Sequence, residues 1–106
     1  MDINTIQENG KVVITPVIAP NGRLDFIASE SGQLQNEVNA ALDIAEEVRL
    51  DFSHISHISS AGLRVLLAIQ KSAKSKGVPL VIFNVTNEAM KIIKMTGFDQ
   101  KISIEK

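Results

Sequence analysis

Residues 51–67 of this 106-residue chain read Asp51-Phe-Ser-His-Ile-Ser-His-Ile-Ser-Ser-Ala-Gly-Leu-Arg-Val-Leu-Leu67. A short strand is predicted at residues 48–52, where apolar and polar residues alternate. A polar turn follows, and the adjacent serines Ser59 and Ser60 stand directly before a segment predicted to be helical, residues 61–76. This part of the chain is therefore a strand-turn-helix unit whose helix begins at a pair of hydroxyl groups.

Outward from this unit, hydrophobic patterns predict the other elements. Apolar residues three and four positions apart indicate a helix from Ser29 or Ser31 to Glu46. They also indicate a further helix that is capped by Thr86 or Asn87 and ends at Gly97. β-Branched or continuous apolar runs predict strands at residues 3–6, 11–18, 80–85 and 102–104.

Each predicted helix has one apolar stripe, and we expect these stripes to form the core together with the strands. Met90 and Met95 are predicted to pack in this core rather than to form a docking surface. The stripes consist of Leu34, Val38, Ala41, Leu42 and Ala45 in the first helix, Leu63, Leu66, Leu67 and Ala73 in the second, and Ala89, Met90, Ile93 and Met95 in the third.

The connections between elements predict the topology of the sheet. The turn pair Asn9-Gly10 joins the first two strands, which should therefore be antiparallel. Pro16 favours a bulge or an edge position, because proline cannot donate to a ladder. The second half alternates strand and helix, so its strands should be parallel. We expect a small single-domain α/β protein over residues 1–106, with a mixed sheet of about five strands and three or four helices.

Composition excludes several classes of site. Hydrophobic residues make up 44% of the chain, which predicts a packed core, and the absence of cysteine excludes disulfides, thiolate metal sites and a cysteine nucleophile. The net charge of −1 gives no reason to expect a nucleic acid or a membrane as a partner. The acidic start of the chain does not resemble a secretion signal, so we expect a cytoplasmic protein.

Two interpretations of the serine pair are open from the residues alone. Serine is a favoured N-cap, so a structural role suffices for one hydroxyl. A helix N-terminus also stabilises a bound or covalently attached phosphate. Two hydroxyls are present where one would cap, and the small residues Ala61 and Gly62 that follow would leave the helix start uncovered for a partner.

Four segments in the expected order resemble the STAS domain of anti-sigma factor antagonists. Asp51-Phe52-Ser53 and Ser59-Ser60-Ala61-Gly62-Leu63 are similar to the family's strand end and helix opening, Asp-Leu-Ser and Asp-Ser-Ser/Ala/Thr-Gly-Leu. Gly22-Arg23-Leu24-Asp25 resembles its Gly-x-Leu-Asp turn, and Met95-Thr96-Gly97-Phe98 resembles its Leu-Thr-Gly-Leu segment. The resemblance covers nearly the whole chain.

The resemblance implies a binding switch that operates by phosphorylation. The serine that is phosphorylated in the family corresponds to Ser60. Ser59 is the alternative acceptor, because it stands where the family has aspartate. The unphosphorylated protein would bind an anti-sigma factor that is also a serine kinase, and so release a sigma factor. The kinase would phosphorylate the serine from ATP, and a metal-dependent serine phosphatase would reverse the reaction.

The surface expected to bind the partner surrounds this serine. For Asp25, a turn or cap aspartate is an equally good interpretation, and Arg64 is one helical turn into the site. The residues expected to form this partner-binding surface are Asp25, Ser59, Ser60, Ala61, Gly62 and Arg64.

Other functions receive less support from the sequence. We expect no catalytic residue, metal site or cofactor, because His54 and His57 lack further ligands at a suitable spacing. A serine hydrolase would need a base and an acid beside the serine, and the Gly-x-Ser-x-Gly elbow is absent. The stronger alternative is a STAS domain that serves as a non-switching binding subunit of a transporter or signalling assembly. Ser59 in place of the aspartate keeps this alternative open.

Overall fold

The computed structural model describes residues 2–17, 23–24 and 28–105. The elements along these ranges are β1 (Asp2–Glu8), β2 (Lys11–Val17), β3 (Arg23–Leu24), α1 (Ala28–Ile44), β4 (Glu47–Asp51), β5 (His57–Ile58), α2 (Ser60–Lys76), β6 (Leu80–Phe83), α3 (Asn87–Met95) and the 3₁₀ turn η1 (Phe98–Gln100).

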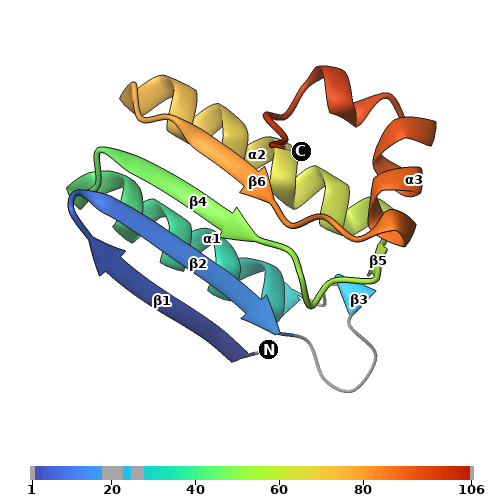
Figure 1. Ribbon diagram of the computed structural model, residues 1–106, viewed down its shortest axis with the longest axis horizontal. Coiled ribbons are helices and arrows are strands. Elements are labelled where there is room, and N and C mark those ends of the chain that lie inside the picture. The colour runs from blue at the N-terminus through green and yellow to red at the C-terminus, as the bar shows by residue number, and fades with distance from the viewer. Residues whose placement is uncertain (1, 18–22, 25–27, 106) are drawn as a thin grey trace.

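One mixed sheet organises the molecule, with the strand order β1-β2-β4-β6 (Figure 1). β1 and β2 are antiparallel, and β4 and β6 are parallel, as the sequence predicts. β2 is also parallel to β4. β3 and β5 form a separate two-residue parallel pair. The expected small α/β fold with a mixed sheet is confirmed.

The last predicted strand is reduced to one bridge. Ile104 pairs with Ile82 of β6 in parallel, through hydrogen bonds from Ile82 N to Ser103 O (2.9 Å) and from Glu105 N to Ile82 O (2.8 Å). Residues 98–100 form a 3₁₀ turn directly before this segment, which leaves too few residues for a ladder. The main sheet therefore has four strands in the described chain, rather than about five.

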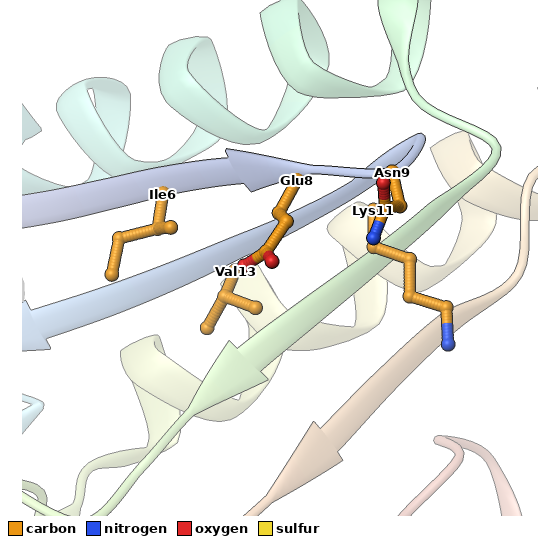
Figure 2. A pocket seen from close by; sticks show the side chains of 5 residues that line it. All are labelled: Ile6, Glu8, Asn9, Lys11 and Val13. Carbon is orange, nitrogen blue, oxygen red and sulfur yellow. The ribbon is translucent and has the colours of Figure 1, made fainter.

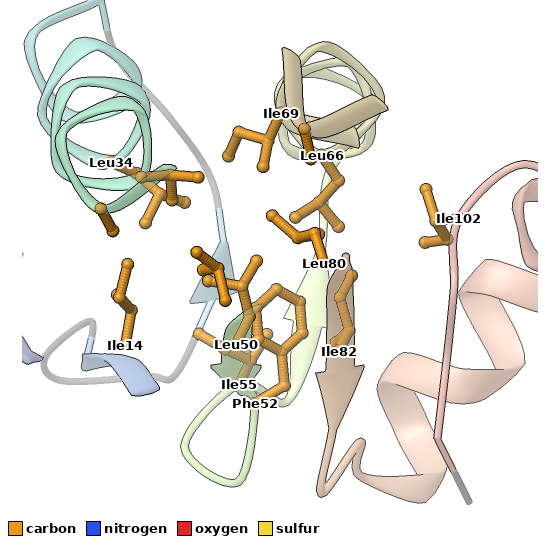
Figure 3. Close-up of a cluster of buried hydrophobic side chains, with 14 of the residues drawn as sticks. Ile14, Leu34, Leu50, Phe52, Ile55, Leu66, Ile69, Leu80, Ile82 and Ile102 are labelled. Carbon is orange, nitrogen blue, oxygen red and sulfur yellow. The ribbon is translucent and has the colours of Figure 1, made fainter. Parts of the chain in front are cut away.

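α1 and α2 cover one face of the sheet and enclose a core of aliphatic side chains and Phe52 (Figures 1 and 3). Leu34 and Val38 of α1 and Leu66 and Ile69 of α2 are almost completely buried against the strands. The predicted apolar stripe of this helix did not include Ile69. It did include Leu67, which is only half-buried. The inward-facing strand residues are Val12, Ile14, Val48, Leu50, Leu80 and Ile82.

The prediction for Met95 is wrong. Its side chain is 86% exposed, and Met90 is only half-buried. The buried residues of α3 are Ala89 and Ile93, which are four positions apart and therefore share one face of the helix. Met95 follows Ile93 by two residues, about 200° around the helix, and so points away from the core.

Pro16 is neither at a bulge nor on an edge strand. The register between β1 and β2 is continuous, with Pro16 opposite Ile3, and β2 lies inside the sheet. The ladder between β2 and β4 ends at the pair Ile14–Leu50. Because Pro16 lies beyond that pair, its missing N–H removes no hydrogen bond to β4.

Arg49 of β4 fastens the C-terminal segment to the uncovered face of the sheet. Its guanidinium donates to Glu105 (2.6 Å) and to Glu47 (3.1 Å), and it lies 4.7 Å from the centre of the Phe83 ring. These two hydrogen bonds, the one to Glu105 first, raise the pKa of Arg49 above its usual value. The guanidinium stays charged throughout the physiological range, so this contact does not act as a pH switch.

The β1–β2 turn requires glycine at one position. Asn9 and Gly10 both have positive φ, 53° and 80°, which is typical of the tight hairpin turn predicted from this pair. Glu46 N donates to Gly10 O (2.7 Å), which ties the turn to the connection between α1 and β4. A Cβ atom on Gly10 would lie 2.6 Å from Glu46 Oε2.

Two glycine-to-alanine substitutions should therefore have opposite effects on stability. Gly10→Ala should lower the free energy of unfolding by about 1–2 kcal/mol, because alanine disfavours positive φ. Gly32→Ala is the matched control: Gly32 lies within α1 with open space around its Cα. It should raise the free energy of unfolding by about 0.5–1 kcal/mol. Urea denaturation measures both, and equal effects would contradict the assigned turn.

Candidate phosphorylation and partner-binding site

The loop between β4 and α2 is anchored by apolar side chains although it is rich in polar residues. Phe52, Ile55 and Ile58 are buried, whereas His54 is exposed. Ile55 N donates to Phe52 O at 3.0 Å, which closes a turn. This alternation fixes the path of the chain up to Ser59, where α2 is about to begin.

Thr86 joins this loop to the start of α3. Its hydroxyl donates to Ile55 O (2.7 Å) and accepts a hydrogen bond from Ala89 N (3.2 Å), so one oxygen caps α3 and holds the loop. The sequence predicted Thr86 or Asn87 as the cap. The link to Ile55 had no signal in the sequence, because it joins residues 31 positions apart.

Asp51 ties together the ends of two neighbouring strands. Its Oδ1 accepts from Ser53 N (3.0 Å) and from Asn84 Nδ2 (3.4 Å), across the ends of β4 and β6. These contacts stabilise the edge of the sheet from which the loop to α2 departs.

The β3–β5 pair brings another segment to the same place. Leu24 pairs with Ile58, the residue that directly precedes Ser59. Asp25, the candidate from this segment, lies outside the described residues. The pairing between β3 and β5 is described as far as Leu24, the residue that precedes Asp25.

Ser59 and Ser60 have different positions at the helix start. Ser59 is the N-cap of α2, with extended backbone (φ −79°, ψ 169°), and its Oγ accepts from Gly62 N at 3.1 Å. Ser60 is the first residue of the helix, and it is exposed. The first serine therefore caps the helix, which leaves the second accessible.

The other candidates differ in accessibility. Arg64 is exposed, and its Nε donates to Ser60 O at 3.5 Å. Ala61 is half-buried. Gly62 is buried, so it is not itself part of the exposed surface at the helix start. Its backbone N–H donates to the cap, Ser59.

The charge around the helix start suits a negative group. α2 has 17 residues, so the positive end of its dipole is fully developed at Ser60. Its first turn contains no acidic residue, and Arg64 lies one turn further on. A phosphate on Ser60 would therefore be stabilised by the helix end and would be within reach of a guanidinium.

The described residues provide neither a cluster of metal ligands nor a membrane-spanning helix. In the part of the chain that the structure describes, no three His, Cys, Asp or Glu side chains are grouped so that they could hold a metal ion. None of the helices described is both long enough and apolar enough to span a bilayer. His57 is half-buried in β5.

A family model of the STAS domain matches residues 5–106. This chain belongs to the STAS domain family. The match takes in all of the site described above. The STAS domain is a binding and regulatory domain, and the fold is the one that the sequence resemblance implied.

Known proteins of this family are similar to the chain in sequence and fold. It is 32% identical over 72 residues to BtrV of Bordetella bronchiseptica, a protein named as a putative anti-sigma factor antagonist. The match spans 67% of this chain but only 62% of that relative. The anti-sigma factor antagonist SpoIIAA in its unphosphorylated form has the same fold, with a TM-score of 0.73 and 15% identity, over 99% of this chain and 89% of that one. The Bacillus cell fate determinant SpoIIAA in its phosphorylated form has a TM-score of 0.68 and 15% identity, over 99% of this chain and 92% of that one. The chain is thus similar in sequence to a relative named as a putative anti-sigma factor antagonist, and similar in fold to the antagonist SpoIIAA.

Substitution of each serine by alanine should separate their roles. Ser59→Ala should lower the free energy of unfolding by ~1 kcal/mol, because the Gly62 amide loses its acceptor. Ser60→Ala should change it by less than ~0.5 kcal/mol, as for other exposed positions. Ser59→Asp is the control, since a carboxylate can also cap, and it should retain the stability of the wild type. Chemical denaturation followed by circular dichroism measures all three. A larger loss for Ser60→Ala than for Ser59→Ala would contradict this assignment.

Proposed function

We propose that this STAS domain is an anti-sigma factor antagonist controlled by phosphorylation of Ser60. In its unphosphorylated form it binds an anti-sigma factor that is also a serine kinase, and the sigma factor is released. A serine phosphatase restores the binding form. The exchange takes place in the cytoplasm, where the kinase finds its ATP.

The observation that supports this proposal is the exposed hydroxyl of Ser60 at the first position of α2. A kinase needs an accessible acceptor, and phosphorylation of a structural cap would cost stability. Here Ser59 provides the cap, so Ser60 can be modified without loss of that hydrogen bond. This also supports Ser60 over Ser59 as the acceptor. Both forms of SpoIIAA share the fold of this chain, which agrees with a modification that leaves the fold intact.

The physical basis of the switch is a charge placed in a contact surface. A phosphate adds about −1.5 to −2 charges at neutral pH. Within the free protein, the helix end and Arg64 balance this charge. In a complex, the partner must cover or oppose the same charge, and an acidic or nucleotide-bearing surface would be repelled. Since ~1.4 kcal/mol lowers affinity tenfold, one phosphate is sufficient. The partner surface comprises Ser59, Ser60, Ala61 and Arg64, with Asp25 and the buried Gly62 as supporting positions.

The chain itself catalyses no reaction in this proposal. The STAS domain supplies the acceptor, while the kinase and the phosphatase carry out the chemistry on it.

The second candidate function is a non-switching binding subunit of a transporter or signalling assembly. It is favoured by Ser59, which stands where the family motif has aspartate. In this case the same helix end would bind a partner permanently, and Ser60 would stay unmodified.

Two variants of Ser60 test the switch. Ser60→Ala should bind the cognate kinase-type anti-sigma factor as the wild type does, whereas Ser60→Asp should bind at least about tenfold more weakly. Ser60→Asp should nevertheless be as stable as the wild type, or more stable by about 0.3–1 kcal/mol, because its charge lies at a helix N-terminus. Calorimetric titration and thermal unfolding measure the two properties.

Incubation with the kinase and ATP distinguishes the two candidate functions. The wild type and Ser59→Ala should each gain one phosphate by mass spectrometry, and Ser60→Ala should gain none. Equal binding by Ser60→Ala and Ser60→Asp, or phosphorylation of Ser60→Ala, would contradict the proposal. A wild type that binds the partner but is never phosphorylated would support the non-switching subunit.

A further inference from the structure

The outer edge of β1 is an open strand with an apolar hollow on each of its two sides. β1 is seven residues long, is the outermost strand of the sheet, and is exposed except at Ile3. On the helix side, a hollow of about 130 Å³ lies between β1 and α1, lined in part by Thr5, Ala40 and Ile44. On the uncovered side, a hollow of about 260 Å³ is lined by Ile6 and Val13, among others (Figure 2).

Exposed apolar side chains gather at these hollows. The described residues include three exposed large hydrophobic residues: Ile6 (61%), Ile44 (65%) and Met95 (86%). Ile6 and Ile44 line the hollows on opposite sides of β1, and Met95 lies on α3. An added strand directs alternate side chains to opposite faces of a sheet. Its side chains would therefore reach Ile6 and Ile44 in turn.

The charges around β1 indicate what kind of strand fits. Asp2 and Glu8 stand at its two ends, and Glu46 lies beside the hairpin turn. Glu37 of α1 accepts a hydrogen bond from Thr5 Oγ1 (3.2 Å). Of the described residues that line the two hollows, Lys11 is the basic one. Its side chain points away from the other labelled residues in Figure 2. An occupant with basic residues would complement this edge.

The same charges disfavour a second copy of this chain. If two β1 strands paired antiparallel over their whole length, Asp2 of each would lie opposite Glu8 of the other. Whole-length parallel pairing would place identical carboxylates side by side. Like charges directly opposite each other destabilise a strand pair, and acidic ends on an edge strand oppose self-association.

We propose that the β1 edge binds an extended segment of a partner protein as an added strand. The segment has apolar side chains at successive positions, which point in turn into the two hollows on opposite faces of the sheet, and it has basic residues at its ends. Main-chain hydrogen bonds to the free edge provide affinity, and the hollows and charges provide selectivity.

This site is separate from the serine site. The hollows lie near Lys11 and Ile44, at the amino ends of the parallel strands and the end of α1, whereas Ser60 follows the carboxyl end of β4. Asp2, at the other end of β1, is separated from the end of β4 by β2, so a strand on the outer edge of β1 leaves the serine site free. The proposal does not depend on phosphorylation.

A synthetic peptide probe tests this site in the full chain. The probe is a fluorescein-labelled peptide, Lys-Lys-Val-Val-Val-Val-Val-Lys-Lys, which presents valine to both faces, and its charge-reversed counterpart has glutamate in place of each lysine. The lysine peptide should bind saturably at low salt and should slow amide hydrogen exchange in β1. The glutamate peptide should bind at least about tenfold more weakly.

Three matched variants locate the binding site. Ile6→Lys and Ile44→Lys, each at an exposed position, should weaken binding of the lysine peptide at least about fivefold. Met95→Lys makes the same change on α3 and should leave binding within about twofold of the wild type. Ser60→Asp should bind the peptide as the wild type does, which separates this proposal from the phosphorylation switch. Circular dichroism checks that each variant is folded.

Several outcomes would overturn the proposal. They are the absence of saturable binding, binding without protection of β1 amides, equal affinity for the two peptides, and equal weakening by Met95→Lys. Concentration-dependent dimerisation that is lost in Ile6→Lys would show that a second copy occupies the edge, and would also overturn it.

Discussion

Parallel pairing of β4 on both of its edges is the constraint on which the rest of the structure depends. β4 lies between β2 and β6, and its inward-facing Val48 and Leu50 are fully buried under α1 and α2. Because both edges are hydrogen-bonded, the strand cannot shift its register without breaking two ladders. The point at which β4 ends is therefore fixed, and the loop that follows must begin there.

That fixed end determines what the serine pair can do. The loop from Phe52 to Ile58 is held by buried side chains and by Thr86, so Ser59 arrives at the start of α2 in the extended conformation of a cap. Ser60 then becomes the first helical residue and remains exposed. Capping and exposure need different residues here, because the hydroxyl that accepts from Gly62 is already occupied. Two adjacent serines satisfy both requirements.

The two ends of the sheet differ in chemical character. At the carboxyl end of β4, the start of α2 provides a positive helix end and Arg64. At the opposite end and along β1, exposed apolar residues lie among the carboxylates of Glu8, Glu37 and Glu46. A small domain has a limited surface, and this separation lets it present two dissimilar surfaces without mutual interference.

The sequence by itself determined the element order, the antiparallel hairpin at Asn9-Gly10 and the parallel second half. These features follow from local turn chemistry and from hydrophobic periods, which act over a few residues. It also indicated a serine pair at a helix start, but it could not assign the cap, because either hydroxyl has the required chemistry.

Only the tertiary structure decided which serine caps α2, that Met95 faces outward, and that residues 102–104 form a bridge rather than a strand. Each depends on the rotation of a helix, or on contacts between residues far apart in the chain, such as Thr86 with Ile55. Such contacts have no local pattern, because packing against the sheet sets them.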